Sequence, residues 1–497
     1  MQAEKQQFSS KYGFIMAAVG SAVGLGNIWR FPYVTYENGG GAFLVAYFIA
    51  FFSAAIPILI LEYVLGNKYR GTAPLVFARI RKKYEFLGWL PVFVAGVIIF
   101  YYSVILAWTM NYIRFATTKS WGLDTESFFI NDFLQSSDSP LNLGSINWPI
   151  AIALLFLWAS AYYFMSKRVD KGLEAINKIM NPIMFLLIIV IMVQGLTLPG
   201  ASDGLNVLFS PQWRKLLDPS VWIAAYGHVF FSCSVALGIM ITFSSYRPRK
   251  SEIVNTSFIT SLTNSFFEII CAIAVFSILG YMALAQQKPV TEVVTGGVGL
   301  SFITFPVAIN FMGEGGIIFG VLFFLCLAVA GYTSFLSLLE AFSAPFVEKF
   351  NLTRKKSFAV TCGVGFVVSL LFATGAGLAA LDIVDYFINS YGLTLAGGLQ
   401  MVFCGWIVKN LPGLQSYANE HSYFKVGRWW IICIKFIAPT VIFANFINME
   451  WLFITHGYHD YSLTALVVYC GGTAMFVTTC VVAFTKAKWR TPIENYE

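Results

Sequence analysis

The chain alternates between long apolar stretches and short polar segments. Twelve of the apolar stretches reach the length, about 20 residues, that a helix needs to cross a bilayer. In order they are 12–36, 41–66, 86–116, 146–165, 172–197, 219–246, 252–285, 313–346, 357–374, 378–408, 429–448 and 461–485. Backbone groups in lipid must bond within their own segment, so these stretches are expected to be helices. The pattern predicts an all-α polytopic protein with the lipid bilayer as its surroundings.

Composition agrees with a membrane protein. Of the 497 residues, 58% are hydrophobic and 11% are charged, where a soluble chain carries about 25% charged residues. A large soluble globule, a disordered chain and a secreted disulfide scaffold are therefore excluded. The 8 cysteines all lie in apolar stretches without CxxC spacing, so they are expected to be buried residues rather than metal ligands or disulfides.

Basic residues mark the orientation of the predicted spans. Lys and Arg number 24 in the N-terminus, 67–85, 166–171, 247–251, 347–356, 409–428 and the C-terminus, and 4 in the alternate loops. This asymmetry places both termini in the cytoplasm and favours an even number of spans. The net charge of +7 therefore reflects topology, and no nucleic-acid partner is expected. Both glycosylation sequons, at Asn255 and Asn351, fall on the cytoplasmic side, which suits a bacterial inner membrane better than an animal cell surface.

Two of the predicted spans contain residues that interrupt a helix. Three glycines lie within Gly20–Gly26 of the first span, and Ser232–Gly238 interrupt the sixth. Residues 22–26 and 234–238 match at three of five positions. Each break opens a run of five helices, 12–197 and 219–408, and five is an odd number, so the second run enters from the other side of the membrane. We therefore predict one transporter domain with a 5+5 inverted repeat, a binding site at the paired breaks, and two added helices in 429–485.

Several motifs carry a resemblance to a known family. They are Gly20-Ser-Ala-Val-Gly-Leu-Gly-Asn-Ile-Trp-Arg-Phe-Pro32 and Glu37-Asn-Gly-Gly-Gly-Ala-Phe43, then Tyr101-Tyr102, Val221-Trp-Ile-Ala-Ala225, Phe230-Phe231-Ser232, Asn264 with Glu268, Ala330-Gly-Tyr-Thr-Ser334 and Leu381-Asp-Ile-Val-Asp385. Together they resemble the neurotransmitter:sodium symporters over nearly the whole chain, and the first string is the most specific. The resemblance implies sodium-driven uptake by alternating access. Proton-coupled or uncoupled amino-acid transport on the same fold is the alternative.

Other functional classes fit the chain less well. The apolar spans contain no ring of charges or repeated filter loop of the kind that selects ions in a channel. The 4 histidines form no HExxH motif, and no Ser/His/Asp or Cys/His arrangement stands out, so an enzyme is not expected. Accumulation of a solute against a gradient would separate a transporter from both.

The resemblance assigns residues to two sodium sites and to a substrate pocket. The first sodium site is expected to use Ala22, Asn27, Ser232 and Asn264, with the substrate carboxylate completing it. The second is expected to use Gly20, Val23, Ala330, Thr333 and Ser334. Oxygen ligands suit a hard cation, and a shared ligand would couple ion and substrate binding. The substrate is expected to touch Ala22, Gly24, Leu25, Gly26, Ile98, Tyr102, Phe231, Ser232, Ser234, Leu237, Ser334 and Leu338.

The expected pocket favours neutral, hydrophobic L-amino acids. Amine-transporting relatives carry Asp at the position of Gly24, so without it the substrate must bring its own carboxylate. Tyr102 is expected to hydrogen-bond that carboxylate, and Phe231 to close over the substrate. Leu237 replaces a Phe of a bacterial family member and would leave room for larger side chains, whereas Ala236 replaces Gly and would take some room back.

Charged residues near the breaks are expected to gate and couple transport. Arg30 and Asp385 would form the outer gate, directly or through water, and Lys5 with Glu348 would form the inner one above Phe8. Glu268 stands where chloride-dependent relatives carry Ser, so its carboxylate would replace chloride and suggests proton counter-transport on the return step. His228 replaces a Gln beside it and predicts a steeper pH dependence. Glu62, Glu174, Tyr246 and Glu340 are expected at cytoplasmic helix ends in local networks.

Overall fold

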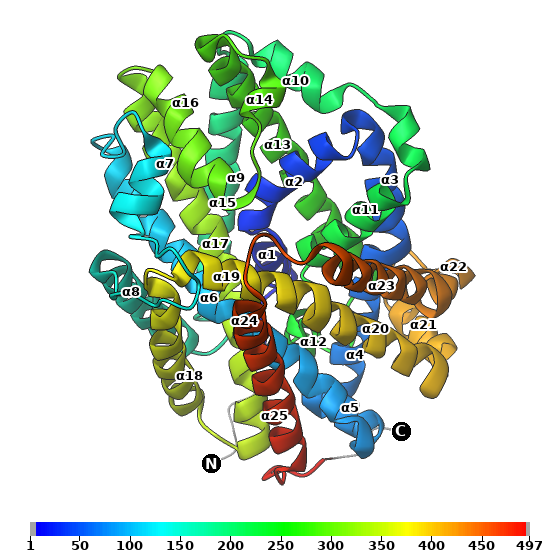
Figure 1. Ribbon diagram of the computed structural model, residues 1–497. Helices are drawn as coiled ribbons and strands as arrows, with labels where there is room; N and C mark the ends of the chain where they lie inside the picture. Colours follow the sequence, from blue (N-terminus) through cyan, green and yellow to red (C-terminus); the bar gives the residue numbers. More distant parts are fainter. Residues whose placement is uncertain (1–5, 494–497) are drawn as a thin grey trace.

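The computed structural model describes residues 6–493 and is a bundle of helices (Figure 1). In that part of the chain there is no β-strand, only an isolated antiparallel bridge between Ile146 and Thr374. Nine of its helices are long and apolar enough to span a membrane, or up to 11 if each sharply bent pair counts as one span. The all-helical expectation is confirmed. The count of twelve stays a prediction, because the range 219–246 holds two short helices instead of one long one.

The long helices follow the predicted apolar stretches closely. The first half of the chain contains α1 (Lys11–Ala22), α2 (Leu25–Glu37), α3 (Phe43–Ala50), α4 (Ile56–Tyr69), α5 (Ala73–Ile80), α6 (Phe86–Ala116), α7 (Thr125–Ser127), α8 (Trp148–Met165), α9 (Leu173–Leu196), α10 (Ala201–Phe209), α11 (Pro219–Ser232) and α12 (Ile239–Ser245). A π-helical turn, Phe51–Ala55, joins α3 to α4 into one continuous segment.

In the second half of the chain, the long helices again follow the predicted spans in order. They are α13 (Val254–Gln286), α14 (Val290–Val293), α15 (Gly297–Gly299), α16 (Phe305–Phe311), α17 (Gly315–Phe350), α18 (Arg354–Ser369), α19 (Gly377–Phe387), α20 (Thr394–Val402), α21 (Leu411–Glu420), α22 (Arg428–Ile432), α23 (Ala438–His456), α24 (Leu463–Leu466) and α25 (Gly472–Lys486). The short helices α14–α16 and the loop helix α10 lie outside the predicted spans.

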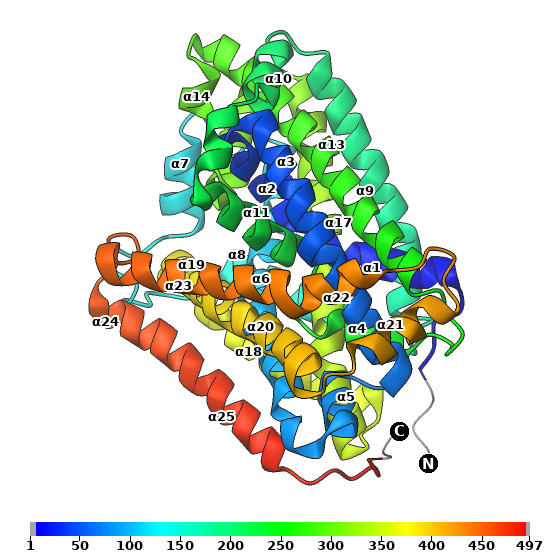
Figure 2. The same cartoon turned by 90° about the vertical axis from the view of Figure 1, so that its right-hand side faces the viewer.

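The interrupted helices lie inside the bundle. Helix α2 packs against α11, α13 and α17, and α1 packs against α9, α13 and α17 (Figure 1). The last helix, α25, runs along one edge of the molecule, where it contacts α6 (Figure 2). The first and last described residues lie at the same end of the bundle, which we call the terminal end (Figures 1 and 2). Helices α10, α14 and α16 gather at the opposite end.

Apolar burial accounts for the packing of the interior. Four tryptophans, Trp89, Trp108, Trp121 and Trp430, are among the largest fully buried side chains. Rings from α6 pack edge-on or tilted against rings from α17 and from the π-helical turn Phe128–Phe133. The eight cysteines are all free and are buried or partly buried, as their apolar surroundings predicted. Many large apolar side chains on α8, α9, α18 and α25 stay exposed, as expected of surfaces that face lipid.

Candidate functional site: a cavity at two helix breaks

The first break separates α1 from α2 at Val23 and Gly24. Both residues are extended, and the two helices bend by 55° across them. The Asn27 side chain stabilises the new helix end, because its Oδ1 accepts a hydrogen bond of 2.8 Å from the Gly24 backbone N–H. A Cβ on Gly24 would lie 2.9 Å from Ser334 Oγ, so only glycine fits there without a shift. The break therefore exposes carbonyls of α1 and N–H groups of α2 at one place.

The second break is longer and contains residues with left-handed backbone. Helix α11 ends at Ser232 and α12 begins at Ile239, and φ is 51° at Ser234, 65° at Ala236 and 71° at Gly238. Left-handed conformations are strained for residues with a Cβ, so the surrounding structure has to hold them. Ser234 Oγ donates 2.8 Å to the carbonyl of Ser21 and ties the two breaks together.

Glu62 supports the second break, which corrects the expectation that it faces the cytoplasm at a helix end. It lies fully buried within α4, and its Oε1 accepts hydrogen bonds from the Ala236 backbone N–H at 2.9 Å and from Gln400 at 3.2 Å. The Glu62 carboxylate thus replaces the helical carbonyl partner that the Ala236 backbone N–H loses at the break. The other three residues form the expected local networks: Glu340 binds Arg354 and Tyr246, and Glu174 binds Ser9.

A cavity of about 1080 Å³ opens from the two breaks. It passes Arg30 and Asp385 and reaches the loops 138–140, 296–298 and 458–462. All twelve residues predicted to touch the substrate line it: Ala22, Gly24, Leu25, Gly26, Ile98, Tyr102, Phe231, Ser232, Ser234, Leu237, Ser334 and Leu338. Sequence reasoning missed its outer rim, where Asp382 accepts hydrogen bonds from Tyr458 at 3.0 Å and Tyr461 at 3.1 Å.

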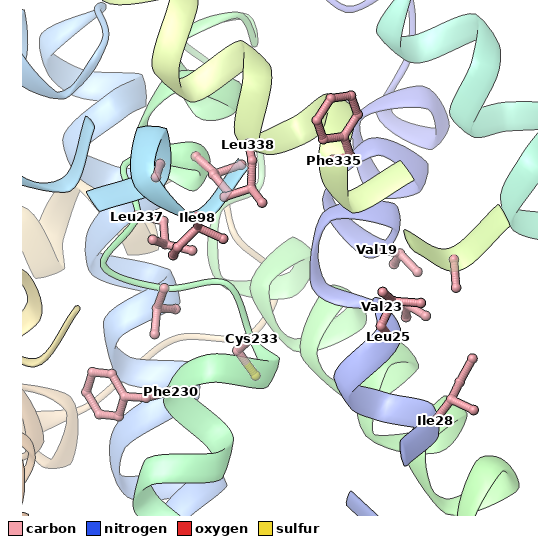
Figure 3. Packing of buried hydrophobic residues seen from close by; sticks show 14 of the residues in the cluster. Val19, Val23, Leu25, Ile28, Ile98, Phe230, Cys233, Leu237, Phe335 and Leu338 are labelled. Carbon is pink, nitrogen blue, oxygen red and sulfur yellow. The ribbon is translucent and has the colours of Figure 1, made fainter. Parts of the chain in front are cut away.

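The deep end of the cavity is apolar on one side and polar on the other. Ile98, Leu237 and Leu338 lie together on the apolar side (Figure 3). Tyr102 lies one helical turn after Ile98 on α6 and accepts a hydrogen bond of 3.4 Å from the Leu25 backbone N–H. Ala236 is absent from the lining, because it is fully buried and its Cβ would lie 3.0 Å from a Cβ on Gly397. The expectation that Ala236 narrows the pocket is therefore wrong.

The three side chains expected at the first sodium site, those of Asn27, Ser232 and Asn264, meet in one polar cluster. Asn27 Nδ2 donates 2.9 Å to Asn264 Oδ1, and Asn264 Nδ2 donates 2.6 Å to Ser232 Oγ. Ala22 ends α1 beside them and lines the same cavity. This set offers amide, hydroxyl and backbone oxygens, which is the donor chemistry that sodium requires.

The residues expected at the second sodium site also come together. Ser334 Oγ lies 3.1 Å from the Gly20 carbonyl oxygen and 2.9 Å from that of Val23. Thr333 Oγ1 lies 3.0 Å from the carbonyl oxygen of Ala330. The Ser334 hydroxyl in the middle of α17 therefore reaches carbonyls at the end of α1, whereas the Thr333 hydroxyl next to it bonds within its own helix. That sodium binds here stays a prediction.

Glu268 is the most heavily hydrogen-bonded acid near the breaks. It is fully buried, and its Oε1 accepts from Ser232 at 2.6 Å and lies 2.8 Å from His228 Nε2. Its Oε2 accepts from Tyr47 at 2.6 Å. Asn27 Nδ2 also lies 3.2 Å from Oε1, so the acid touches the first sodium cluster directly. The carboxylate is therefore surrounded by four hydrogen-bonding side chains, Asn27, Tyr47, His228 and Ser232.

The two expected gates differ, because the outer one is open and the inner one is closed. Arg30 and Asp385 both line the cavity, but these two described residues form no ion pair with each other. Asp385 instead accepts from Tyr101 at 2.6 Å, and the Arg30 guanidinium lies 5.2 Å from the centre of the Phe231 ring. The passage from the loops to the breaks is thus open in this conformation.

At the terminal end the route is closed. Phe8 is buried against Phe14 and Phe243, with ring centres 5.4 Å and 5.9 Å apart. Glu348 accepts hydrogen bonds from Thr72, and its expected partner Lys5 lies outside the described residues. A second cavity, of about 720 Å³, lies beyond Phe8 and shares no lining residue with the first.

The chain after α25 folds back onto this end, which the sequence did not indicate. Trp489 Nε1 donates 2.9 Å to Glu85 Oε2, and Lys349 forms a buried ion pair with Glu85 Oε1. The Lys349 ammonium also lies 4.8 Å from the centre of the Trp489 ring, a cation–π distance. Thr491 adds a hydrogen bond to the Glu348 carbonyl, so the tail forms part of the wall of the second cavity.

Comparisons with known proteins identify the family. The model of the sodium:neurotransmitter symporter family matches residues 5–125 and 117–491, together nearly the whole chain. The chain belongs to the sodium:neurotransmitter symporter family. An uncharacterised sodium-dependent transporter of Methanocaldococcus jannaschii is 36% identical over 93% of this chain and 94% of its own length.

Further relatives of the symporter include an animal transporter and a protein of known structure. A sodium- and chloride-dependent GABA transporter 2 of Rattus norvegicus is 28% identical over 89% of this chain and 80% of its own length. The crystal structure of MhsT in complex with L-phenylalanine matches with a TM-score of 0.76 and 30% identity, over 90% of this chain and 100% of MhsT. The symporter is thus a multi-pass, sodium-dependent membrane transporter, and its relatives are transporters rather than enzymes.

Proposed function

We propose that this symporter imports neutral, hydrophobic L-amino acids together with sodium by alternating access. The observation that carries the proposal is the convergence of both helix breaks on one cavity whose deep end joins apolar side chains to oxygen donors. Ile98, Leu237 and Leu338 would hold the side chain, and Tyr102 with the α2 N-terminus would hold the carboxylate. Neighbouring MhsT in complex with L-phenylalanine supports an amino acid of this kind.

Two sodium ions would be co-transported with the amino acid. The first would bind at Ala22, Asn27, Ser232 and Asn264, where the substrate carboxylate can supply a further oxygen. The second would bind at Gly20, Val23, Ala330, Thr333 and Ser334. Because the substrate carboxylate would also be a ligand of the first ion, sodium and substrate would each raise the affinity for the other by the same factor.

We further propose that transport is independent of chloride. Glu268 provides a fixed negative charge within hydrogen-bond distance of Asn27 and Ser232, so no anion has to enter with sodium. Once sodium has left, the buried carboxylate would lose its cationic neighbour, and protonation would let the protein return without a buried charge. Proton counter-transport is therefore part of the proposal, with His228 as the neighbour that would tune it.

The proposed orientation places the terminal end in the cytoplasm and the loops 138–140, 296–298 and 458–462 outside. The excess of basic residues on the terminal side supports it. In that orientation the structure faces outward, since the cavity is open past Arg30 and closed at Phe8. The membrane we propose is the inner membrane of a bacterium.

The decisive experiment is uptake into proteoliposomes with a panel of labelled amino acids. We expect leucine, phenylalanine, methionine and tryptophan to accumulate only with an inward sodium gradient, and dopamine and glutamate to compete weakly. Accumulation that follows a proton gradient without sodium would favour the proton-coupled alternative. Equilibration without accumulation would refute coupled transport.

A further inference from the structure

Helix α9 carries a stripe of buried polar side chains that the proposed sodium sites do not use. Glu174, Asn177 and Asn181 are spaced by three and four residues, so they share one face of the helix, and all three are fully buried. This face packs against α1, next to the first break (Figure 2). Polar side chains are costly inside a membrane helix and are functional candidates by default.

Two glycines let the stripe approach the α1 backbone. A Cβ on Gly13 would lie 1.8 Å from Glu174 Oε1, and one on Gly20 would lie 2.1 Å from Asn177 Oδ1. The same Cβ on Gly20 would lie 2.9 Å from both Oδ1 and Nδ2 of Asn181, so both amide oxygens lie close to this residue. Gly13 and Gly20 lie two helical turns apart on the same face of α1.

The orientation of both amides is fixed by their nitrogen atoms. Asn177 Nδ2 donates 2.8 Å to the Leu173 carbonyl, and Asn181 Nδ2 donates 2.5 Å to the Met16 carbonyl. Asn177 Oδ1 therefore points away from its own helix towards Gly20, whereas Asn181 turns both amide atoms towards α1. No residue in 6–493 donates a hydrogen bond to either Oδ1. Two buried amide oxygens near one residue, neither with a hydrogen-bond donor, form an environment that suits a hard cation.

We propose that Asn177 and Asn181 form a relay site for the sodium ion that leaves the second sodium site towards the cytoplasm. The proposal rests on the proposed function, because it needs sodium at that site. Gly20 lies between the two places: its carbonyl oxygen is 3.1 Å from Ser334 Oγ, and its Cα faces the two amide oxygens. When α1 moves away from α9, an ion released by the carbonyls of the break would meet these oxygens next.

Glu174 would receive the ion after the relay site. Its carboxylate accepts from the Ser9 backbone N–H at 2.6 Å and from Ser9 Oγ at 2.5 Å, and Lys178 pairs with it at 2.6 Å. These contacts hold the start of α1 onto α9 and close the stripe at the terminal end. Their rupture on inward opening would free the carboxylate for the ion while Lys178, one-third exposed, swings into solvent.

A purely structural role of Asn177 and Asn181 would predict a different result. Polar side chains also join membrane helices to one another, and in that case their loss weakens packing. Stability, sodium-dependent substrate binding and transport would then fall together. A relay site changes the rate of ion release and leaves the equilibrium at the second sodium site unchanged.

The test uses the full-length protein with Asn177→Leu and Asn181→Leu, which keep the side-chain volume and remove the oxygen. Met184→Leu, a buried change on the same helix, is the matched control. In detergent, we expect half-saturating sodium for labelled-leucine binding to stay within about twofold of wild type, with unchanged melting temperature. In proteoliposomes, we expect radiolabelled sodium release and uptake turnover to fall about tenfold or more in both variants and not in the control.

The variant Asn181→Asp separates the two explanations further. A carboxylate at this position would hold the cation more tightly, so sodium binding should strengthen while release slows. A parallel fall in stability, binding and turnover in the Leu variants would overturn the relay, as would unchanged release rates. Wild-type leucine binding that needs no sodium would refute the proposed function instead, and that result would appear before any variant is compared.

Discussion

Glu268 offers the sharpest test of ion coupling, through the substitution Glu268→Ser. The serine removes a buried carboxylate that accepts hydrogen bonds from Ser232 and Tyr47 and lies 2.8 Å from His228. It leaves a space of several heavy atoms lined by these donors, which is a suitable place for an anion. We expect the variant to need chloride for sodium-dependent uptake and the wild type to be indifferent to it.

The size of the effect of Glu268→Ser on sodium affinity depends on which hydrogen-bond donors around Glu268 keep another partner. Tyr47 retains Ser265 at 2.6 Å, and Ser232 retains Asn264 at 2.6 Å. The Nδ1 atom of His228 accepts no hydrogen bond from the described residues, so without Glu268 the ring has none on either nitrogen. One buried polar group left unpaired costs about 1–3 kcal/mol, which corresponds to about 5- to 150-fold in apparent sodium affinity.

The assay is leucine uptake into proteoliposomes as a function of sodium, with chloride or gluconate as the sole anion. In gluconate the variant should need about 5- to 150-fold more sodium, and chloride should recover most of the loss. Glu268→Gln is the control, because it removes the charge without making room, so both anions should give the same poor uptake. A wild type that already needs chloride, or a Ser variant indifferent to it, would refute the role of Glu268.

Three more predictions concern the pocket, the tail and a helix end. Leu237→Phe should shift competition in uptake from tryptophan towards leucine, whereas Ala236→Gly should not, because the Ala236 side chain faces α20 rather than the cavity. Lys349→Met should lower the melting temperature more than the double variant with Glu85→Gln, since a lone buried charge costs about 3–5 kcal/mol. The pKa of Asp218 lies below its usual value because a backbone N–H donates to its carboxylate. The stabilisation it gives over Asp218→Asn should therefore hold at neutral pH and disappear as pH falls through that lowered pKa.

The sequence was sufficient for the helices and for the residues around the cavity. Long apolar stretches have one stable form in a membrane, and the glycines at Gly24 and Gly26 indicate a break because they weaken a helix. Candidate residues from four distant segments then fell on one cavity through the family motifs. The hydrogen-bond partners of these residues could not be predicted from the sequence, because they depend on the direction of each side chain.

Two examples show what pattern alone could not give. Glu62 looks like a charged residue near a helix end, yet the break in a helix 174 residues later supplies its N–H partner. Trp489 lies in a polar tail whose docking partner Glu85 is 404 residues away. Local spacing carries no information on such contacts, since they are fixed only when the helices have packed.

The hydroxyl of Ser334 would let the first break both hold its shape and accept the sodium ion that we propose for the second site. It lies within hydrogen-bond distance of the carbonyl oxygens of Gly20, Ser21 and Val23, at 3.1, 3.1 and 2.9 Å. A hydroxyl has one proton, so it can donate to one of these oxygens at a time and leaves the others available. Sodium binding would exchange a shared hydrogen bond for ion contacts and let the serine oxygen become a ligand itself. The break would then be stabilised in both states, and the net gain that drives sodium binding would be modest, as a transporter that must release its ion requires.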